Sequence, residues 1–249
     1  TAGVVIGADG LWSRVRAAVV AHEAAPRFSG IVAYRTLVRQ ADLPAHLRSQ
    51  HVTAWLGRNL HMVHYPVQAG EGLNVVALVR GNQPENLQTW DHSANAAHLQ
   101  AAMANQAKPV QDLVAAIGQW RLWPLCDRPP VAAAAEMVKG RVALLGDAAH
   151  PMRPFMAQGA GMAIEDAAVL SHCLQQMGST PEALQRYASL RWQRCARVQQ
   201  RSIRNGEIFH AQGVMRLGRD LSMRLLGEHI LDVPWLYGDN TARNLAKSA

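Results

Sequence analysis

The sequence lacks several features that define common classes of protein. It has only three cysteines, Cys126, Cys173 and Cys195, and none of them forms a C-x-x-C pair. A sparse and odd set favours a reducing compartment and argues against a disulfide framework or a structural zinc site. No apolar run approaches the roughly 20 residues of a membrane-spanning helix, and no signal peptide is visible. We therefore expect a cytoplasmic protein without a bound metal.

A glycine-rich dinucleotide motif is also absent. The pattern G-x-G-x-x-G cradles a pyrophosphate where a strand turns into a helix. The early glycines Gly3, Gly7 and Gly10 do not have this spacing. The chain starts at Thr1 without an initiator Met and enters an apolar run at once. We therefore expect it to be the C-terminal part of a longer protein.

The composition is that of a globular protein with an excess of positive charge. The 249 residues are 49% hydrophobic and 17% charged, which is enough for a core in one or two domains. The net charge of +7 suits nucleic acid, an acidic membrane or a small anion. The sequence has no basic patch with interleaved aromatic residues, so nucleic acid is the least favoured of these three partners. Six arginines share one late helical stretch and form either a solvated face or a surface that attracts anions: Arg186, Arg191, Arg194, Arg197, Arg201 and Arg204.

The first half of the chain combines a short strand–helix segment with a run of strands. Residues 4–6 are predicted as a strand and residues 11–20 as a helix, and Pro26 marks a change of region. Strands are then predicted at 31–38, 51–56, 60–67 and 73–79, separated by glycine-containing turns. Short connections between consecutive strands imply an antiparallel sheet. Helices at 93–105, with Ser93 as N-cap, and at 109–117 precede a strand at 120–125.

The second half is mainly helical. A short apolar strand is predicted at 142–145, and an alanine-rich helix starts near residue 159. Gly178 is a candidate C-cap for this helix, and Thr180 with Pro181 is a candidate start for the next one. That helix is expected to end near Asn205–Gly206. A helical tail from Glu207 is expected to end near residues 235–238.

Residues 141–170 carry the most informative pattern in the chain. An apolar strand ends at Gly146-Asp147, and a turn with two prolines leads to Gly159-Ala160-Gly161 at the start of a helix. A carboxylate at a strand end can accept hydrogen bonds from ribose hydroxyls. Glycines allow the backbone to approach a ligand, and a helix N-terminus offers free N–H groups to negative charge. This layout predicts a nucleotide site.

Two stretches together resemble one family of flavoenzymes. Residues 141–170 resemble the Gly-Asp motif, and residues 4–16, VVIGADGLWSRVR, resemble the Asp-Gly motif, of the single-component FAD-dependent aromatic hydroxylases, the salicylate and 3-hydroxybenzoate 6-hydroxylase group. The resemblance implies an α/β fold: an incomplete Rossmann-like FAD-binding domain with an inserted antiparallel-sheet substrate domain and C-terminal helices. It places the FAD-binding parts at 1–25 and 126–178, the substrate domain at 26–125 and the helices at 179–249.

The same resemblance implies the reaction. NAD(P)H would reduce FAD, and molecular oxygen would form a flavin hydroperoxide that hydroxylates an aromatic acid or phenol. One alternative is an epoxidase or tailoring oxygenase acting on a larger apolar substrate. Another is a truncated and catalytically silent remnant, and a homodimer is one option for assembly. The arginine stretch would then attract anionic NAD(P)H or the aromatic acid.

The motifs also imply which residues hold the cofactor. Asp147 would bind ribityl or ribose hydroxyls, and the Gly159–Gly161 N–H groups would stabilise negative charge on the reduced flavin. Asp9 would approach the diphosphate–ribose region through water, and Arg14 would anchor its loop. The full cofactor-binding set is Asp9, Gly10, Arg14, Gly146, Asp147, Pro151, Gly159, Ala160, Gly161 and Met162.

The predicted catalytic set is Pro151, His64, Tyr65 and Arg153. Pro151 would lie beside the flavin ring, and Arg153 either pairs with a substrate carboxylate or faces solvent. His64 and Tyr65, with Tyr34, Arg35 and His61, are candidate substrate contacts on the sheet. Strand alternation puts His61 and Tyr65 on one face and His64 on the other, so only one set can line a pocket. His150, Glu165 and Asp166 are interpreted as hydrogen-bonded scaffold residues.

Overall fold

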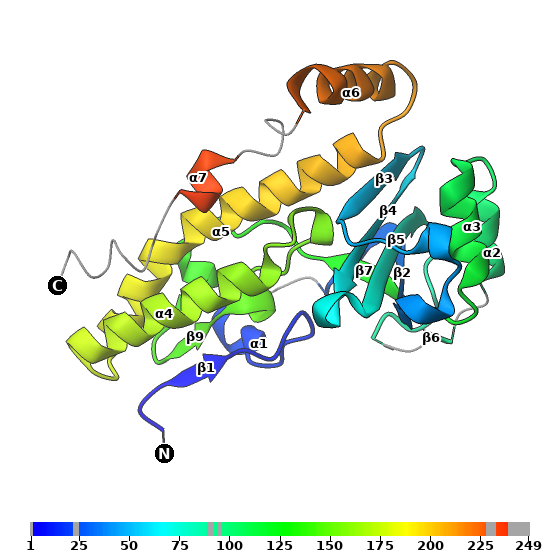
Figure 1. Ribbon diagram of the computed structural model, residues 1–249. Helices are drawn as coiled ribbons and strands as arrows, with labels where there is room; N and C mark the ends of the chain where they lie inside the picture. Colours follow the sequence, from blue (N-terminus) through cyan, green and yellow to red (C-terminus); the bar gives the residue numbers. More distant parts are fainter. Residues whose placement is uncertain (1, 22–24, 89–91, 94–95, 228–232, 239–249) are drawn as a thin grey trace. The chain divides into compact units, whose positions relative to one another are not determined.

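A computed structural model describes residues 2–21, 25–88, 92–93, 96–227 and 233–238 of the chain (Figure 1). Contacts divide the chain into two compact units. The first comprises Thr1–Arg27, Cys126–Gly206 and Ser222–Ala249, and the second comprises Phe28–Leu125 and Glu207–Leu221. We name them the three-stranded unit and the six-stranded unit after their sheets. The chain thus begins in the first unit, builds most of the second and returns to the first, and Glu207–Leu221 then adds a further segment to the second.

The sheet of the three-stranded unit joins strands that are far apart in the sequence. Its order is β1-β9-β8, and its strands are β1 (Val5–Gly7), β8 (Val138–Lys139) and β9 (Val142–Leu144). β1 and β9 are parallel, with Ile6 opposite Ala143, whereas β8 and β9 are antiparallel. Ala143 and Leu144 are fully buried. The strands predicted at 4–6 and 142–145 are therefore confirmed to within a residue or two.

The helix predicted at 11–20 is wrong over its first half, because only α1 (Arg16–Val19) is helical. The carboxylate of Asp9 accepts hydrogen bonds from the Ser13 hydroxyl at 2.5 Å and from the Arg14 backbone N–H at 2.7 Å. An Asp side chain that binds nearby N–H groups stabilises a turn in competition with helix. The apolar residues 11–12 therefore lie in a turn that precedes the helix.

Two long helices and one short helix complete the three-stranded unit: α4 (Gly159–Met177), α5 (Pro181–Phe209) and α7 (Pro234–Tyr237). Gly178 ends α4 with a φ of 68°, and the Thr180 hydroxyl accepts a hydrogen bond from the Ala183 N–H at 3.2 Å, as predicted for these caps. α5 continues one turn beyond its predicted end at Gly206. Residues 228–232 of the predicted helical tail lie outside the described residues.

The six-stranded unit contains the predicted antiparallel sheet, in the order β3-β4-β5-β2-β7-β6 (Figure 1). The strands are β2 (Arg27–Arg39), β3 (Thr53–Gly57), β4 (Leu60–Val67), β5 (Gly72–Arg80), β6 (His92–Ser93) and β7 (Arg121–Asp127). The register sets Tyr34 and Met62 opposite Ala77. These three side chains belong to a core with α2 (Ala97–Met103) and α3 (Lys108–Ala116), so helices cover this face of the sheet.

The predicted helix at 93–105 is wrong at its start. Ser93 lies in β6 opposite Arg121, and the helix begins at Ala97. Pairing with a neighbouring strand is a tertiary interaction that overrides the local capping signal. The unit also contains the first part of α6 (Gly213–Leu226), whose Val214, Leu217 and Leu221 are exposed.

Short 3-10 turns connect many of these elements: η1 (Gln40–Asp42), η2 (Ala45–Leu47), η3 (Gln68–Gly70), η4 (Ala134–Glu136), η5 (Gly146–Ala148) and η6 (Pro154–Met156). Two of them, η5 and η6, lie between β9 and α4 in the segment that the sequence predicts as a nucleotide site. Within the part of the chain that the structure describes, no helix combines the length and apolar character needed to cross a membrane.

Candidate functional site

The turn that follows β9 presents one acidic side chain without a partner. Gly146 has a φ of 58°, and a Cβ at this position would lie 3.2 Å from the Cβ of Ala163, so the turn requires glycine. Asp147 is exposed, and among the described residues none donates a hydrogen bond to its carboxylate. Although the residue is exposed, surrounding protein atoms partly desolvate its carboxyl group and raise its pKa, and the nearby His150 partly offsets this. Asp147 is therefore available to accept hydrogen bonds from a ligand.

The first turn of α4 adjoins this carboxylate. A Cβ added to Gly159 would lie 3.9 Å from an Asp147 carboxylate oxygen, and nothing else described lies within 4 Å of it. The Met162 N–H to Gln158 carbonyl bond, at 2.9 Å, is the first of the helix, and no side chain caps the helix start. The N–H groups of residues 159–161 thus precede the first helical hydrogen bond. Among the described residues, the unbonded N–H groups of the first turn and the unpartnered Asp147 carboxylate thus lie close together.

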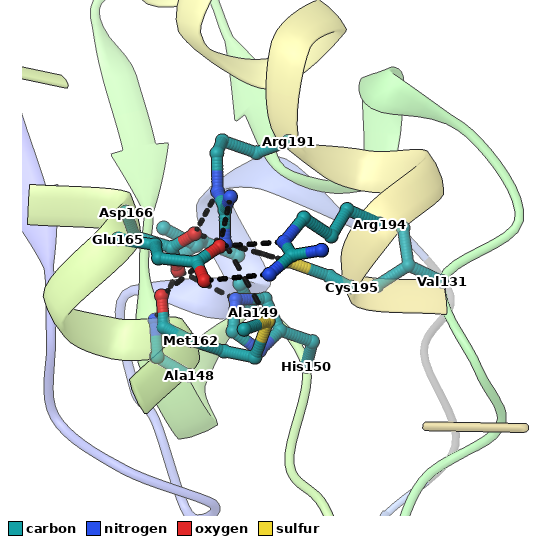
Figure 2. Close-up of polar contacts among 12 residues, drawn as sticks. Val131, Ala148, Ala149, His150, Met162, Glu165, Asp166, Arg191, Arg194 and Cys195 are labelled. Atoms are coloured by element: carbon teal, nitrogen blue, oxygen red, sulfur yellow. Dashed lines mark hydrogen bonds and ion pairs between the residues drawn. The ribbon is translucent and has the colours of Figure 1, made fainter. Parts of the chain in front are cut away.

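A single buried carboxylate fixes the turn at both of its ends (Figure 2). One oxygen of Asp166 accepts a hydrogen bond from the Gly146 N–H at 3.0 Å and lies 2.5 Å from Nε2 of His150. The other oxygen accepts a hydrogen bond from Nε of Arg191 at 2.7 Å. All three of these side chains are at most 1% exposed. The segment that carries Asp147 is therefore held from α4 and α5.

The network continues through Glu165 to the C-terminal helix α7. Glu165 accepts hydrogen bonds from Arg191 at 2.6 Å and from Arg194 at 2.7 and 2.8 Å. Arg194 also donates to the backbone carbonyls of Trp235 and Leu236 at 3.1 and 3.0 Å. The solvated face considered for the arginine stretch is wrong for Arg191 and Arg194, whose side chains are 0% and 12% exposed. Sequence periodicity cannot reveal buried acidic partners on another helix.

The charges in this network support one another. Burial alone would lower the pKa of His150, but its contacts with Asp166 and Cys195 raise it to about 10. Burial alone would raise the pKa of Asp166, but His150 and Arg191 lower it. His150, Asp166 and Cys195 lie close enough together to hold a metal ion. Because Asp166 is already occupied by Gly146 and Arg191, we interpret the cluster as an ion-pair network.

The loop that contains Pro151 is fixed by a row of polar side chains on α5. Gln199 donates a hydrogen bond to the Pro151 carbonyl at 3.0 Å, and Ser202 donates to the Arg153 carbonyl at 2.6 Å. Gln199 also accepts one from the Val131 N–H at 2.9 Å. This row was not predicted from the sequence. Its signal is the spacing of three polar residues, Gln199, Ser202 and Asn205, on one helix face.

The Asp-Gly segment contacts the same turn through an arginine that the sequence analysis did not single out. Arg16 is buried and donates hydrogen bonds to the carbonyls of Ala148 at 2.9 Å and Ala149 at 2.7 Å. Arg14 is exposed, and its backbone N–H binds the Asp9 carboxylate. Burial alone would raise the pKa of Asp9, but its hydrogen bonds lower it. Gly10 has a φ of 77°, which suits glycine in this turn.

Arg153 is engaged inside the three-stranded unit. Its guanidinium lies 2.5 Å from the carboxylate of Asp127, which also accepts a hydrogen bond from Arg27 at 2.9 Å. The Arg153 side chain is 18% exposed and the Asp127 side chain is 3% exposed. The sequence led us to expect Arg153 to face either a substrate carboxylate or open solvent. In the structure it is instead paired with the carboxylate of Asp127. Met162, by contrast, is buried in a small cluster with Val198 and Leu236.

The predicted substrate contacts are divided between the two faces of the six-stranded sheet. His64 lies opposite Val75, on the same face as Met62, which packs in the helix-covered core. Burial lowers the pKa of His64. Tyr65 lies opposite Asn74, and its side chain therefore points to the other face, together with His61. His64 and Tyr65 therefore cannot both contact one ligand on one face.

His61 forms a buried pair with a second histidine. Nδ1 of His61 lies 2.9 Å from Nε2 of His210, which follows the last residue of α5. Burial, and then the charge of the partner, lowers the pKa of His61 to about 3. Burial, together with Arg80 and Arg219, lowers the pKa of His210 to about 4. Both rings are therefore neutral near pH 7, and one donates to the other.

The structure thus gathers the predicted cofactor-binding residues in the three-stranded unit, where Gly146, Asp147, Pro151 and the α4 start share one framework. Residues 1–202 match the family model described as FAD binding domain. The chain therefore belongs to this family of FAD-binding domains.

Individual relatives define the group more closely. The chain is 39% identical over 246 residues to 3-hydroxybenzoate 6-hydroxylase of Polaromonas naphthalenivorans (strain CJ2), covering 98% of this chain and 60% of that protein. It is 36% identical to 3-hydroxybenzoate 6-hydroxylase 2 of Aquipseudomonas alcaligenes, covering 98% of this chain and 75% of that protein. A solved salicylate hydroxylase substrate complex is similar with a TM-score of 0.83 at 29% identity, over 100% of this chain and 64% of that chain.

The chain is shorter than the relatives it matches. It spans about 60% of the length of the Polaromonas naphthalenivorans protein and of 3-hydroxybenzoate 6-hydroxylase 1 of Aquipseudomonas alcaligenes. The matches nevertheless cover nearly the whole of this chain, so both of its units have counterparts in those proteins.

Proposed function

We propose that the protein is a FAD-dependent monooxygenase that consumes NAD(P)H and hydroxylates an aromatic acid or phenol. The observation that carries this proposal is the exposed carboxylate of Asp147, which has no partner among the described residues and adjoins the uncapped first turn of α4. The names of the relatives, which are hydroxylases of aromatic acids, support the reaction class. A homodimer and a cytoplasmic location stay predictions.

The residues around Asp147 fit a flavin. A carboxylate whose pKa is raised by partial desolvation gains from hydrogen bonds donated by ribityl or ribose hydroxyls. The N–H groups of residues 159–161 and the positive end of the helix dipole suit the negative charge of a reduced flavin. Gly159 leaves room for a ligand that a larger side chain would fill. Asp147 and residues 159–161 would therefore hold the riboflavin part of FAD.

The remaining motif residues support this site indirectly, by holding its turn and loop in position. Bound FAD would supply hydride acceptance from NAD(P)H and activation of molecular oxygen. Asp166 orients the turn through Gly146 and His150, and Gln199 holds the Pro151 carbonyl. We therefore expect Pro151 to keep a fixed position beside the flavin ring. Asp9 and Arg14 would contribute through the backbone of the Asp-Gly turn, which their hydrogen bond closes.

On the substrate side, the sheet favours Tyr65 over His64. His64 shares its sheet face with the helix-covered core, whereas Tyr65 and His61 share the opposite face. A phenol hydroxyl and a neutral imidazole can donate to or accept from the phenol of a substrate, which would raise the electron density of its ring. We therefore propose Tyr65, with His61 beside it, as substrate contacts.

Oxygen incorporation tests the reaction class. The FAD-loaded protein would be mixed with NADH or NADPH, 3-hydroxybenzoate or salicylate, and isotopically labelled molecular oxygen. A monooxygenase puts one oxygen atom into the product, reduces the other to water and consumes one reduced nicotinamide per product. We expect that stoichiometry by mass spectrometry with at least one of the two acids. Nicotinamide oxidation without labelled product for either acid would contradict the proposal.

A further inference from the structure

A polar cluster lies on the face of the six-stranded sheet that carries Tyr65. Tyr65 on β4 is paired with Asn74 on β5, and Arg35 on β2 is paired with Val76, two residues along the same strand. Residues two apart on a strand share a face. Nε of Arg35 donates a hydrogen bond to the side-chain oxygen of Asn74 at 3.0 Å. Three strands thus bring together a phenol, an amide and a guanidinium.

Asn74 has one polar group left over. Because its oxygen accepts the hydrogen bond from Arg35, the orientation of its amide is fixed and its Nδ2 must lie on the other side. Asn74 is 2% exposed, and its Nδ2 has no hydrogen-bond partner among the described residues. A buried donor without an acceptor is costly, and an acceptor atom on a bound ligand would remove this cost.

Arg35 also keeps most of its donors. It is exposed, its Nε is engaged by Asn74, and among the described residues no carboxylate pairs with its guanidinium. By contrast, an arginine on the same strand and an arginine of the predicted site are both paired with carboxylates. Arg39 is paired with Asp42 at 3.0 Å, and Arg153 is paired with Asp127 at 2.5 Å. Arg35 can therefore present the two terminal nitrogens of its fork to a planar anion.

We propose that Arg35 and Asn74 form the carboxylate subsite for an aromatic acid, which is one of the two roles that the sequence left open for Arg153. The guanidinium would bind the carboxylate, and the Asn74 amide would donate to one of its oxygens. Tyr65, directly opposite Asn74, would then contact the ring or its hydroxyl. This inference rests on the proposed function and identifies the acid group as the determinant of the substrate class.

The test compares two probes that differ only in the acid group. Binding of 3-hydroxybenzoate and of 3-hydroxybenzyl alcohol to the FAD-loaded protein would be measured by titration calorimetry. Arg35→Met keeps the length of the side chain and removes its charge. Asn74→Asp keeps the acceptor for Arg35 and replaces the spare donor by negative charge. Arg39→Met is the matched control, because Arg39 is an exposed arginine on the same strand.

We expect Arg35→Met to weaken 3-hydroxybenzoate binding by roughly 10- to 100-fold, the range for loss of a charged hydrogen-bonded pair. Asn74→Asp should weaken it at least as much. Binding of the alcohol should change less than about threefold in both variants, and Arg39→Met should leave both probes unaffected.

Equal weakening of both probes, or unchanged binding of the acid, would overturn the subsite. Failure of the wild-type chain to take up FAD would instead count against the proposed function, since neither Arg35 nor Asn74 belongs to the unit that carries Asp147. Flavin uptake by each variant, read from its absorbance, separates these two failures and shows that the variants fold.

Discussion

Replacing Asp166 by Asn should destabilise the three-stranded unit more than any exposed charge substitution. Asp166 is fully buried and joins Gly146, His150 and Arg191 through bonds of 2.5 to 3.0 Å. Asn keeps the shape but removes the charge, and its amide N–H₂ faces donors that it cannot accept from. Removing one partner of a buried ion pair costs about 3–5 kcal/mol, because the remaining charges stay buried without compensation.

The assay is urea unfolding at pH 7, with Asp112→Asn as the control. Asp112 pairs with Lys108 at 2.6 Å, but the Lys108 side chain is 77% exposed. An exposed pair contributes at most about 1 kcal/mol. We expect the free energy of unfolding to fall by about 3–5 kcal/mol for Asp166→Asn and by under about 1 kcal/mol for the control. Similar losses of unfolding free energy in the two variants would refute the claim that the buried network holds the turn in place.

The same variant has a second readout in the titration of His150. In the wild-type chain the pKa of His150 is about 10, because its contacts with Asp166 and Cys195 outweigh burial. Without the Asp166 charge, only Cys195 opposes the effect of burial, so the pKa of His150 should fall from this raised value. Histidine ring signals in an NMR titration would show this change. A His150 ring that titrates identically in both proteins would show that Asp166 does not hold its charge.

Three further predictions concern other parts of the framework. The pKa values of His61 and His210 are lowered to about 3 and about 4, so below pH 6.5 the unfolded chain binds more protons than the folded chain. The stability that comes from the neutral pair should therefore be fully present above pH 6.5. Toward pH 4 the free energy of unfolding should fall by up to about 1.4 kcal/mol per pH unit for each histidine. Denaturant unfolding between pH 7 and 4 should show a weaker dependence in His210→Gln, and an identical slope would contradict the pairing. Gly206→Ala should lower the free energy of unfolding by about 1–2 kcal/mol, because the added Cβ would lie 2.6 Å from the ring of Phe155. Gly218→Ala is the control and should not destabilise, because nothing lies within 4 Å of its added Cβ. Equal shifts in unfolding temperature for the two variants would refute this packing argument. Gln199→Leu leaves the Pro151 carbonyl and the Val131 N–H unpaired and should cost about 2 kcal/mol or more in urea unfolding, and a smaller loss would show that water replaces both bonds.

The sequence predicted the turn around Asp147 and most of the strands because both depend on local chemistry. Gly146 adopts a positive φ, Gly178 ends α4, and the strands predicted at 60–67 and 73–79 form at 60–67 and 72–80. The family resemblance was confirmed by the match to the FAD binding domain model. These features are set by residues that are close together in the chain, where propensity and spacing can be read directly.

The missed features depend on contacts across the sequence. Arg16 binds carbonyls more than 130 residues away, and Arg191 binds Asp166 on a different helix. An arginine usually lies at the surface, so the local sequence pattern offered no reason to expect either residue to be buried. The helix start at 93 failed because Ser93 pairs with Arg121 in a sheet. The ion pair between Arg153 and Asp127 was missed for the same reason, because a contact between distant residues leaves no local pattern in the sequence.

The most direct test of the account is a flavin titration of the wild-type chain and of Asp147→Ala. The carboxylate has no partner among the described residues, so its removal should leave the unfolding temperature unchanged. Glu182→Ala, at an exposed acidic residue of the same unit, is the control. We predict saturable FAD binding by the wild-type and control proteins and binding at least roughly 10-fold weaker by Asp147→Ala. Equal FAD affinity in all three proteins, or no binding by the wild type, would contradict the assignment of this turn as the flavin site.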